Sequence, residues 1–299
     1  MTIVSKAFSL SQRKLTKGDL GVEIEVEGFR LPERVDGWNV TRDGSLREEA
    51  GGMALEYVFN GPVGIEETVE RLSSLQKALK NKRSDVVDSP NCGVHVHVNC
   101  QDLTITQLYN FVTLYLVHEH MLTRFCGPTR EGNLFCLRAE DAEYLLYELE
   151  QALLDGEFRG HFSNDRLRYS GMNLCSLSSY GSLEFRSMRG STDPELIEQW
   201  CRLLLCLREK AKEFDSPRGI LEQVSMGGEI AMVLNTFGEA GRFLTQYEGW
   251  EKEIYRGVRR CQDFAYAGDW EALSQAPKRT VGGVTVPQSF TDDFPPEDV

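Results

Sequence analysis

Four short segments, far apart along the chain, alternate apolar side chains with ionisable ones. They span residues 21–27, 55–59, 93–98 and 182–188. Successive side chains of a β-strand point to opposite faces, so the apolar members of each segment can enter a core. The Glu, His and Arg side chains would then share the other face. The pattern predicts strands that carry an active site on one side.

Helical periodicity is found between and after these segments. A surface-packed helix is predicted over residues 65–82, where apolar positions recur every three or four residues. A more apolar helix is predicted over 104–125, with Thr104 and Gln107 in capping-box positions. Further helices are expected at 139–154, 194–214, 217–247 and 249–274. Turns are expected at 38–52, and a loop rich in Arg, His and Asn at 156–173.

The length of 299 residues and the 41% apolar content are sufficient for a packed core. We expect one catalytic domain over residues 19–275, because barrels and large mixed sheets reach that size as single units. Residues 1–18 are expected to form an N-terminal arm. Residues 276–299, rich in Gly, Pro, Ser and Asp, are expected to form a flexible tail.

The net charge of −13 opposes binding to nucleic acid or to an anionic membrane through bulk electrostatics. No run approaches the roughly 18 apolar residues of a membrane span, and residues 1–17 lack an apolar signal core. The eight cysteines are too sparse for a disulfide framework, so reduced thiols are expected. These features predict a cytoplasmic protein.

Three glutamates, Glu23, Glu25 and Glu27, share one face of the first predicted strand. Such a row is often simply the solvent face of an antiparallel strand. Three like charges on one face nevertheless repel one another unless a cation lies among them. Taken with the other segments, the row favours a metal site.

His95 and His97 are two of the five histidines and fall on one face of the third predicted strand. Imidazole tolerates partial burial, so a structural role for the pair is the alternative. Carboxylates elsewhere in the chain make His95 a candidate for a mixed nitrogen and oxygen site for magnesium or manganese.

Glu184 and Arg186 share a face of the fourth predicted strand, and Arg189 follows them. They could form an ordinary cross-strand ion pair. Alternatively, Glu184 binds a divalent ion while the arginines neutralise phosphoryl charge, a task suited to a planar guanidinium. Three loop residues upstream either join this group or are solvated charges: Arg166, Arg168 and Asn173.

Several common signatures are absent from the sequence. It contains no Gly-x-x-x-x-Gly-Lys-Ser/Thr phosphate loop, no Rossmann glycine fingerprint after the first strand and no Gly-x-Ser-x-Gly elbow. No Cys-x-x-Cys pair is present, which argues against a zinc ribbon.

The four motifs, taken in order, resemble those of a known family. They are Glu-x-Glu at 23–25, Leu-Glu-Tyr-Val at 55–58, Cys-Gly-Val-His-Val-His-Val at 92–98 and Ser-Leu-Glu-Phe-Arg at 182–186. This order is similar to that of the amidoligase family of phages and bacteria. These carboxylate-amine ligases are related to glutamine synthetase and gamma-glutamylcysteine ligase. The resemblance covers residues 19–215.

The resemblance implies an α+β fold with a curved antiparallel sheet, backed by helices, whose concave glutamine-synthetase-like face binds nucleotide and divalent ions. The implied metal ligands are Glu23, Glu25, Glu56, His95 and Glu184. The implied nucleotide contacts are His95, His97, Arg168, Asn173 and Arg186. The implied catalytic residues are Arg186, Arg189 and Asp43, the last as a candidate base for the amine.

The implied reaction is ATP-dependent amide formation through an acyl phosphate, with ATP and Mg²⁺ or Mn²⁺ as cofactors. The partners would be small-molecule or peptide carboxylates and amines. Three alternatives stay open at this point: a guanidino-type phosphotransferase on the same fold, a divalent-metal hydrolase, and a non-catalytic metal-binding module. The arginines favour phosphate chemistry, because a simple metal-binding module does not need them.

Overall fold

The computed structural model describes residues 2–42, 52–274, 278–281 and 284–287. Within this part of the chain, seven strands form one open sheet in which every pairing is antiparallel. The strand order is β2 (Trp38–Arg42), β3 (Met53–Phe59), β1 (Leu20–Phe29), β5 (Gly93–Asn99), β7 (Ser182–Arg189) and β6 (Met172–Asn173). β4 (Asp85–Val87) pairs with the end of β1.

The alternation in the strands produces one core face. Val22, Ile24 and Val26 of β1 are buried, as are Val94, Val96 and Val98 of β5. α3 (Ile105–Cys126) contacts β7, and α7 (Pro194–Ala211) contacts β5. α2 (Ile65–Lys82) in turn contacts α7. α2 is also joined to β2, because the indole of Trp38 donates a hydrogen bond to the carbonyl of Arg71. The ionisable side chains therefore remain on the face opposite these helices.

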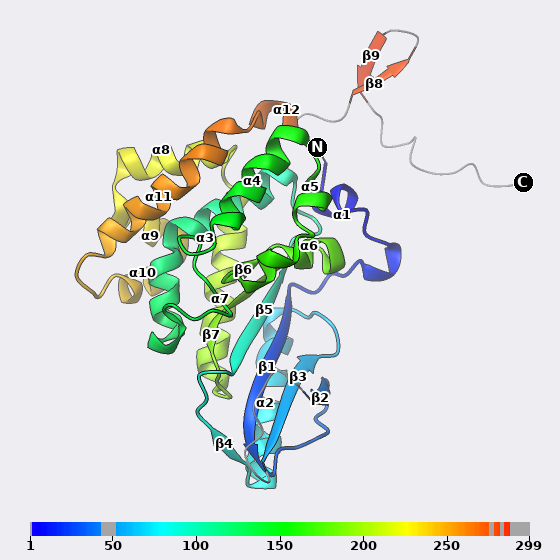
Figure 1. Cartoon of the computed structure of the whole chain (residues 1–299), viewed down its shortest axis with the longest axis vertical. Helices are drawn as coiled ribbons and strands as arrows, with labels where there is room; N and C mark the ends of the chain where they lie inside the picture. Colours follow the sequence, from blue (N-terminus) through cyan, green and yellow to red (C-terminus); the bar gives the residue numbers. More distant parts are fainter. Residues whose placement is uncertain (1, 43–51, 275–277, 282–283, 288–299) are drawn as a thin grey trace, which may run out of the picture.

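The remaining helices lie largely around α3. α11 (Trp250–Ala267) contacts α3, α4 (Glu143–Asp155) and α8 (Pro217–Gly227), and Figure 1 shows this helical part at one end of the molecule, with β1 to β4 extending from it. α9 (Glu229–Phe237), α10 (Glu239–Leu244) and α12 (Trp270–Ser274) complete the C-terminal part. Within the described ranges, no helix is long and apolar enough to cross a membrane.

The mixed helix and sheet class and the antiparallel sheet are confirmed. The helix predicted over 65–82 has the expected ends, and the capping box of Thr104 and Gln107 is formed at the start of α3. The prediction of turns over 38–52 was wrong for its first part, since residues 38–42 form β2 and pair with β3. Residues 43–51 lie outside the described part of the chain.

Other boundaries differ for local reasons. The helix expected from residue 139 begins at Glu143. The stretch 217–247 is divided into α8, α9 and α10 at Gly228 and Gly238, which both have positive φ angles that interrupt a helix. The loop at 156–173 contains α5 (Phe158–His161) and the 3₁₀ helix η3 (Asp165–Tyr169), and α6 (Cys175–Tyr180) lies between β6 and β7.

The two ends of the chain also contain structure. α1 (Val4–Ala7) places Val4 in the core beside Phe8, and the 3₁₀ helix η1 (Gln12–Lys14) follows. At the other end, β8 (Lys278–Val281) and β9 (Val284–Pro287) pair with each other.

Candidate active site

The register of three central strands brings the predicted site residues together. Glu23 of β1 pairs with His95 of β5, and His97 of β5 pairs with Glu184 of β7. Side chains that alternate with buried apolar residues on each strand therefore meet on the open face. The site is built by long-range pairing of segments that are about 70 to 90 residues apart in sequence.

Among the described residues, Glu23, His97 and Glu184 form a group of possible metal ligands. One donor atom from each lies within 4.8 Å of the others, a set that could hold a metal ion. His97 Nε2 is 3.3 Å from Glu23 Oε1. His95 lies beside the group, with Nδ1 3.4 Å from Glu23 Oε2 and 3.8 Å from Glu184 Oε1. His95 is the histidine among the five predicted metal ligands, whereas His97 is the histidine of this group.

The charges in this group stabilise one another. Burial alone would raise the pKa of Glu23, but hydrogen bonds from His95 and His97 outweigh burial and lower it. Burial also opposes ionisation of Glu184, yet the nearby charges of His97 and Arg186 lower its pKa. For His97, burial works against the charged form, while the hydrogen bond to Glu23 and the charge of Glu184 raise the pKa. Both carboxylates are thus held ionised, as metal binding requires.

A second layer of side chains orients the ligands. Ser182 Oγ lies 3.1 Å from Nδ1 of His97, so Nε2 is the nitrogen that faces Glu23. Asn173 Nδ2 and Ser176 Oγ both donate to Glu184 Oε2, at 2.7 and 3.0 Å. Such outer contacts fix the direction of a ligand's lone pairs.

Glu25 and Glu56 line the same cavity, of about 480 Å³, as the group above. Glu25 Oε2 accepts a hydrogen bond of 2.7 Å from the backbone N–H of Gly93, while Oε1 is 3.9 Å from His95 Nε2. Glu56 pairs with Glu25 in the sheet and accepts a hydrogen bond from Thr41. Glu27 is buried near the far end of β1, where it pairs with Ala54 and Val87.

The predicted arginines have different positions. Arg186 forms an ion pair with Glu184 and donates to the carbonyl of Phe135, and both Arg186 and Arg168 line the cavity of the glutamates. Arg189 instead donates to the carbonyl of Cys126 at the end of α3. The guanidinium of Arg166 lies over the ring of Tyr144, 4.4 Å from its centroid. Asp43, the predicted base, lies outside the described residues.

Arg130 supports the strands of the site, and the sequence pattern did not indicate it. Its buried guanidinium donates to the carbonyls of Arg186, Ser187 and Cys92, at 2.7, 3.3 and 3.4 Å. It therefore ties the loop after α3 to β7 and to the start of β5. An arginine after a Gly-Pro turn carries no local signal of this role. Ser182 could have been found, because it lies two residues before Glu184 and hence on the same face.

Comparison with known proteins identifies a family for this chain. A family model with the description "Putative amidoligase enzyme" matches residues 14–207, well over half of the 299-residue chain. The matched stretch includes all seven strands of the sheet and every side chain of the ligand group. No curated protein matches the sequence. The chain therefore belongs to the amidoligase family, whose members are enzymes of the ligase type.

Proposed function

We propose that this protein is an ATP-dependent carboxylate-amine ligase that forms an amide through an acyl phosphate. The observation that carries the proposal is one cavity in which ionised carboxylates and imidazoles lie beside a guanidinium. Glu23, His97 and Glu184 supply the anionic and nitrogen donors, and Arg186 supplies the fixed positive charge. Transfer of a phosphoryl group from the anionic phosphate chain of ATP to an anionic carboxylate needs both metal-binding donors and a fixed positive charge in one place.

The side chains present fit a divalent ion. The three donors lie within 4.8 Å of one another, and Ser182, Asn173 and Ser176 orient them. Carboxylate oxygens together with an imidazole suit Mn²⁺ or Mg²⁺. Glu25, Glu56 and His95 line the same cavity and are the proposed ligands of further ions.

The proposed reaction has two steps. In the first, an oxygen of the substrate carboxylate attacks the γ-phosphorus of ATP, the bond to the bridging oxygen breaks, and ADP leaves. In the second, the amine nitrogen attacks the acyl carbon, the carbon–oxygen bond breaks, and orthophosphate leaves. Divalent ions, when bound, offset the repulsion between the carboxylate and the phosphate chain.

The residues of the chain have separate proposed tasks in these steps. Arg186 stabilises the charge that develops on the transferring phosphoryl group. Arg168, on the same cavity, contacts the phosphate chain. The amine loses its proton to a carboxylate, for which Asp43 remains the proposed candidate.

Calorimetric titration of ATP tests the nucleotide and metal parts of the proposal together. ATP should bind in the presence of Mg²⁺ or Mn²⁺ and not with chelator. Glu23→Gln and Glu184→Gln should each abolish this metal-dependent binding. Glu33→Gln, at an exposed position, is the matched control and should bind as the wild type does. Unchanged metal-dependent binding in both site variants would exclude this site.

Product analysis then separates the reaction types. A ligase releases ADP and orthophosphate in equal amounts, and only when an acid and an amine are both present. ADP release with no orthophosphate would identify a phosphotransferase of the guanidino type. Metal binding with no nucleotide binding would leave a metal hydrolase or a metal-binding module.

A further inference from the structure

A second cavity, of about 430 Å³, adjoins the ligand group at the end of the sheet where β1 begins. We propose that it binds the acid substrate, and that this acid carries a second anionic group besides the carboxylate that reacts. The inference rests on the proposed ligase function and names the substrate class of its site. It depends on the floor of the cavity, on its opposite wall and on its charge.

The floor of the cavity is open because β1 has a glycine there. Gly21 lies on the same face as Glu23 and pairs with His97. A Cβ atom at Gly21 would lie 3.4 Å from Cβ of His97, an ordinary contact, so the backbone itself does not require glycine. Any larger side chain would instead project into the cavity. The missing side chain thus leaves room directly beside a proposed metal ligand.

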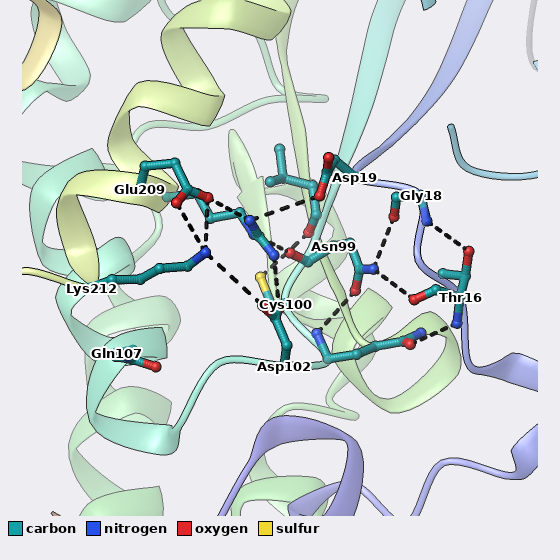
Figure 2. A network of polar contacts seen from close by, with 12 residues as sticks. Thr16, Gly18, Asp19, Asn99, Cys100, Asp102, Gln107, Glu209 and Lys212 are labelled. Carbon is teal, nitrogen blue, oxygen red and sulfur yellow. Dashed lines mark hydrogen bonds and ion pairs between the residues drawn. The ribbon is translucent and has the colours of Figure 1, made fainter. Parts of the chain in front are cut away.

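The opposite wall is residues 11–19, here named the strap, which two amide side chains hold in place. Gln101 donates to the carbonyl of Lys14 and accepts from the N–H of Thr16, at 2.9 and 3.0 Å. Asn99 donates to the carbonyls of Thr16 and Gly18, and Figure 2 shows these contacts. The wall is therefore positioned by the protein's own hydrogen bonds.

Close backbone contact also seats the strap. A Cβ atom at Gly18 would lie 2.1 Å from the carbonyl oxygen of Pro62, so only glycine permits this approach. Pro62 follows β3 and lines the cavity together with Val58 and Phe59. The cavity is thus bounded by the strap, the end of β3 and the floor of the sheet.

The charge lining this cavity differs from that of the whole chain. The protein has a net charge of −13, yet Arg13 and Lys14 of the strap line the cavity. Glu23 is the carboxylate that faces them among the lining residues, and it belongs to the ligand group. A local positive wall in an acidic protein attracts an anionic ligand. The apolar side chain of Val58, which pairs with Glu23 and so shares its face, suits the body of that ligand.

The position of the cavity makes the acid the occupant that fits best. Glu23, His97 and Tyr180 line both this cavity and the cavity of the glutamates, so the two cavities adjoin. A bound acid could direct its reacting carboxylate toward the ligand group and its second anionic group toward the strap. The hollow near the other end of β1 suits an acid less well, because its charged lining residues are Glu25, Asp88 and Arg189.

Two acids of equal length provide the test. Glutarate has two carboxylates and valerate has one, and each is titrated calorimetrically into the full chain with Mg²⁺. We expect glutarate to bind at least about tenfold more tightly than valerate, since a charge-assisted contact is commonly worth that much. The Arg13→Ala/Lys14→Ala double variant should remove the preference. Lys17→Ala is the matched control, because Lys17 is an exposed strap residue outside the lining, and it should keep the preference.

A filling variant tests the floor independently. Gly21→Val should weaken the binding of both glutarate and valerate. Metal-dependent ATP binding should persist in the Gly21→Val variant and in the double variant. Loss of ATP binding in the double variant would place the nucleotide in this cavity and overturn the proposal. Equal binding of the two acids to the wild type, or no binding of either, would also overturn it.

Failure of the ligase proposal can be told apart from failure of this inference. Binding of the acids is measured without turnover and without ATP. A wild type that prefers glutarate but never binds ATP would refute the ligase and keep the anion site. A wild type that binds ATP with metal but binds neither acid would refute the anion site and leave the ligase proposal standing.

Discussion

Asn173 donates a hydrogen bond of 2.7 Å from its side-chain amide to Oε2 of Glu184, its partner in the pairing of β6 with β7. Ser176 donates to the same oxygen. Oε1 of Glu184 is consequently the oxygen that faces Arg186 and His95. The carboxylate is thus oriented from behind by neutral donors, which leaves one oxygen for the site.

Replacing Asn173 should therefore weaken metal binding more than it weakens the fold. Asn173→Ala is expected to reduce Mn²⁺ affinity about 10- to 100-fold, the usual effect of losing an outer-layer contact. Asn173→Asp should be at least as damaging, because it places a second carboxylate against Glu184. Calorimetric titration with Mn²⁺ measures the affinity, and thermal unfolding checks that the fold is intact. Wild-type affinity in the Asp variant would contradict the orienting role.

Arg186→Ala should reduce turnover more than nucleotide binding. A charge that acts mainly on the transferring phosphoryl group contributes to the transition state, and its loss commonly costs about 10²- to 10³-fold in kcat. Steady-state measurement of ADP release gives kcat, and calorimetry gives the affinity for ATP. Arg166→Ala is the control, because its guanidinium lies over Tyr144 and not in the cavity. Equal losses in kcat and in affinity for Arg186→Ala would assign it a binding role only.

Arg130 should be a stability determinant. Its side chain is buried and donates to the carbonyls of Cys92, Arg186 and Ser187, so Arg130→Met leaves these groups without their donor. We expect the free energy of unfolding to fall by roughly 3 kcal/mol. Arg130→Lys keeps the charge but not the fork of donors, and should recover only part of the loss. Urea unfolding measures both variants, and a full recovery with Lys would show that charge alone matters.

Glu119 should make stability depend on pH. Burial raises the pKa of Glu119 to about 7 from 4.5 and outweighs the hydrogen bond from the N–H of Ala139 and the charge of Arg260. The folded state holds the carboxyl proton of Glu119 more firmly than the unfolded state does. The resulting contribution to the free energy of unfolding is therefore fully present below pH 4.5 and is lost as the pH rises through 7. Across this pH range the free energy of unfolding should fall by about 3 kcal/mol.

Glu119→Gln removes this titration. The wild type should therefore lose stability relative to the variant as the pH is raised from 4.5 to above 7. Urea unfolding at a series of pH values measures the difference between the two proteins. A difference that stays constant across this range would mean that the carboxyl group titrates normally in the folded state.

Much of the fold could be predicted from local periodicity. The period-two alternation around Glu23, His95 and Glu184 identified three strands and the face on which their ionisable side chains lie. The capping box at Thr104 and the apolar spacing of 65–82 identified two helices. These features depend on residues within a few positions of one another, so the chain carries them without reference to its fold.

The strand β2 and the role of Arg130 could not be obtained in this way. β2 is a short edge strand whose pairing with β3 gives it its structure. Arg130 acts through the carbonyls of Cys92 and Ser187, 38 and 57 residues away. The strap likewise depends on Asn99 and Gln101, which lie more than 80 residues after it. No local pattern specifies contacts of this kind.

The composition of the ligand group was decided by register. The pairing of β5 with β7 shifts by one residue between Val94 and Val96, and His97 consequently lies opposite Glu184. Without the shift His97 would lie opposite Phe185, whose side chain belongs to the core. The sequence by itself determined which side chains lie on the reactive face, because side-chain alternation is a property of each strand. Only the tertiary structure decided which of them meet, because register follows from the packing of segments that are distant in the chain.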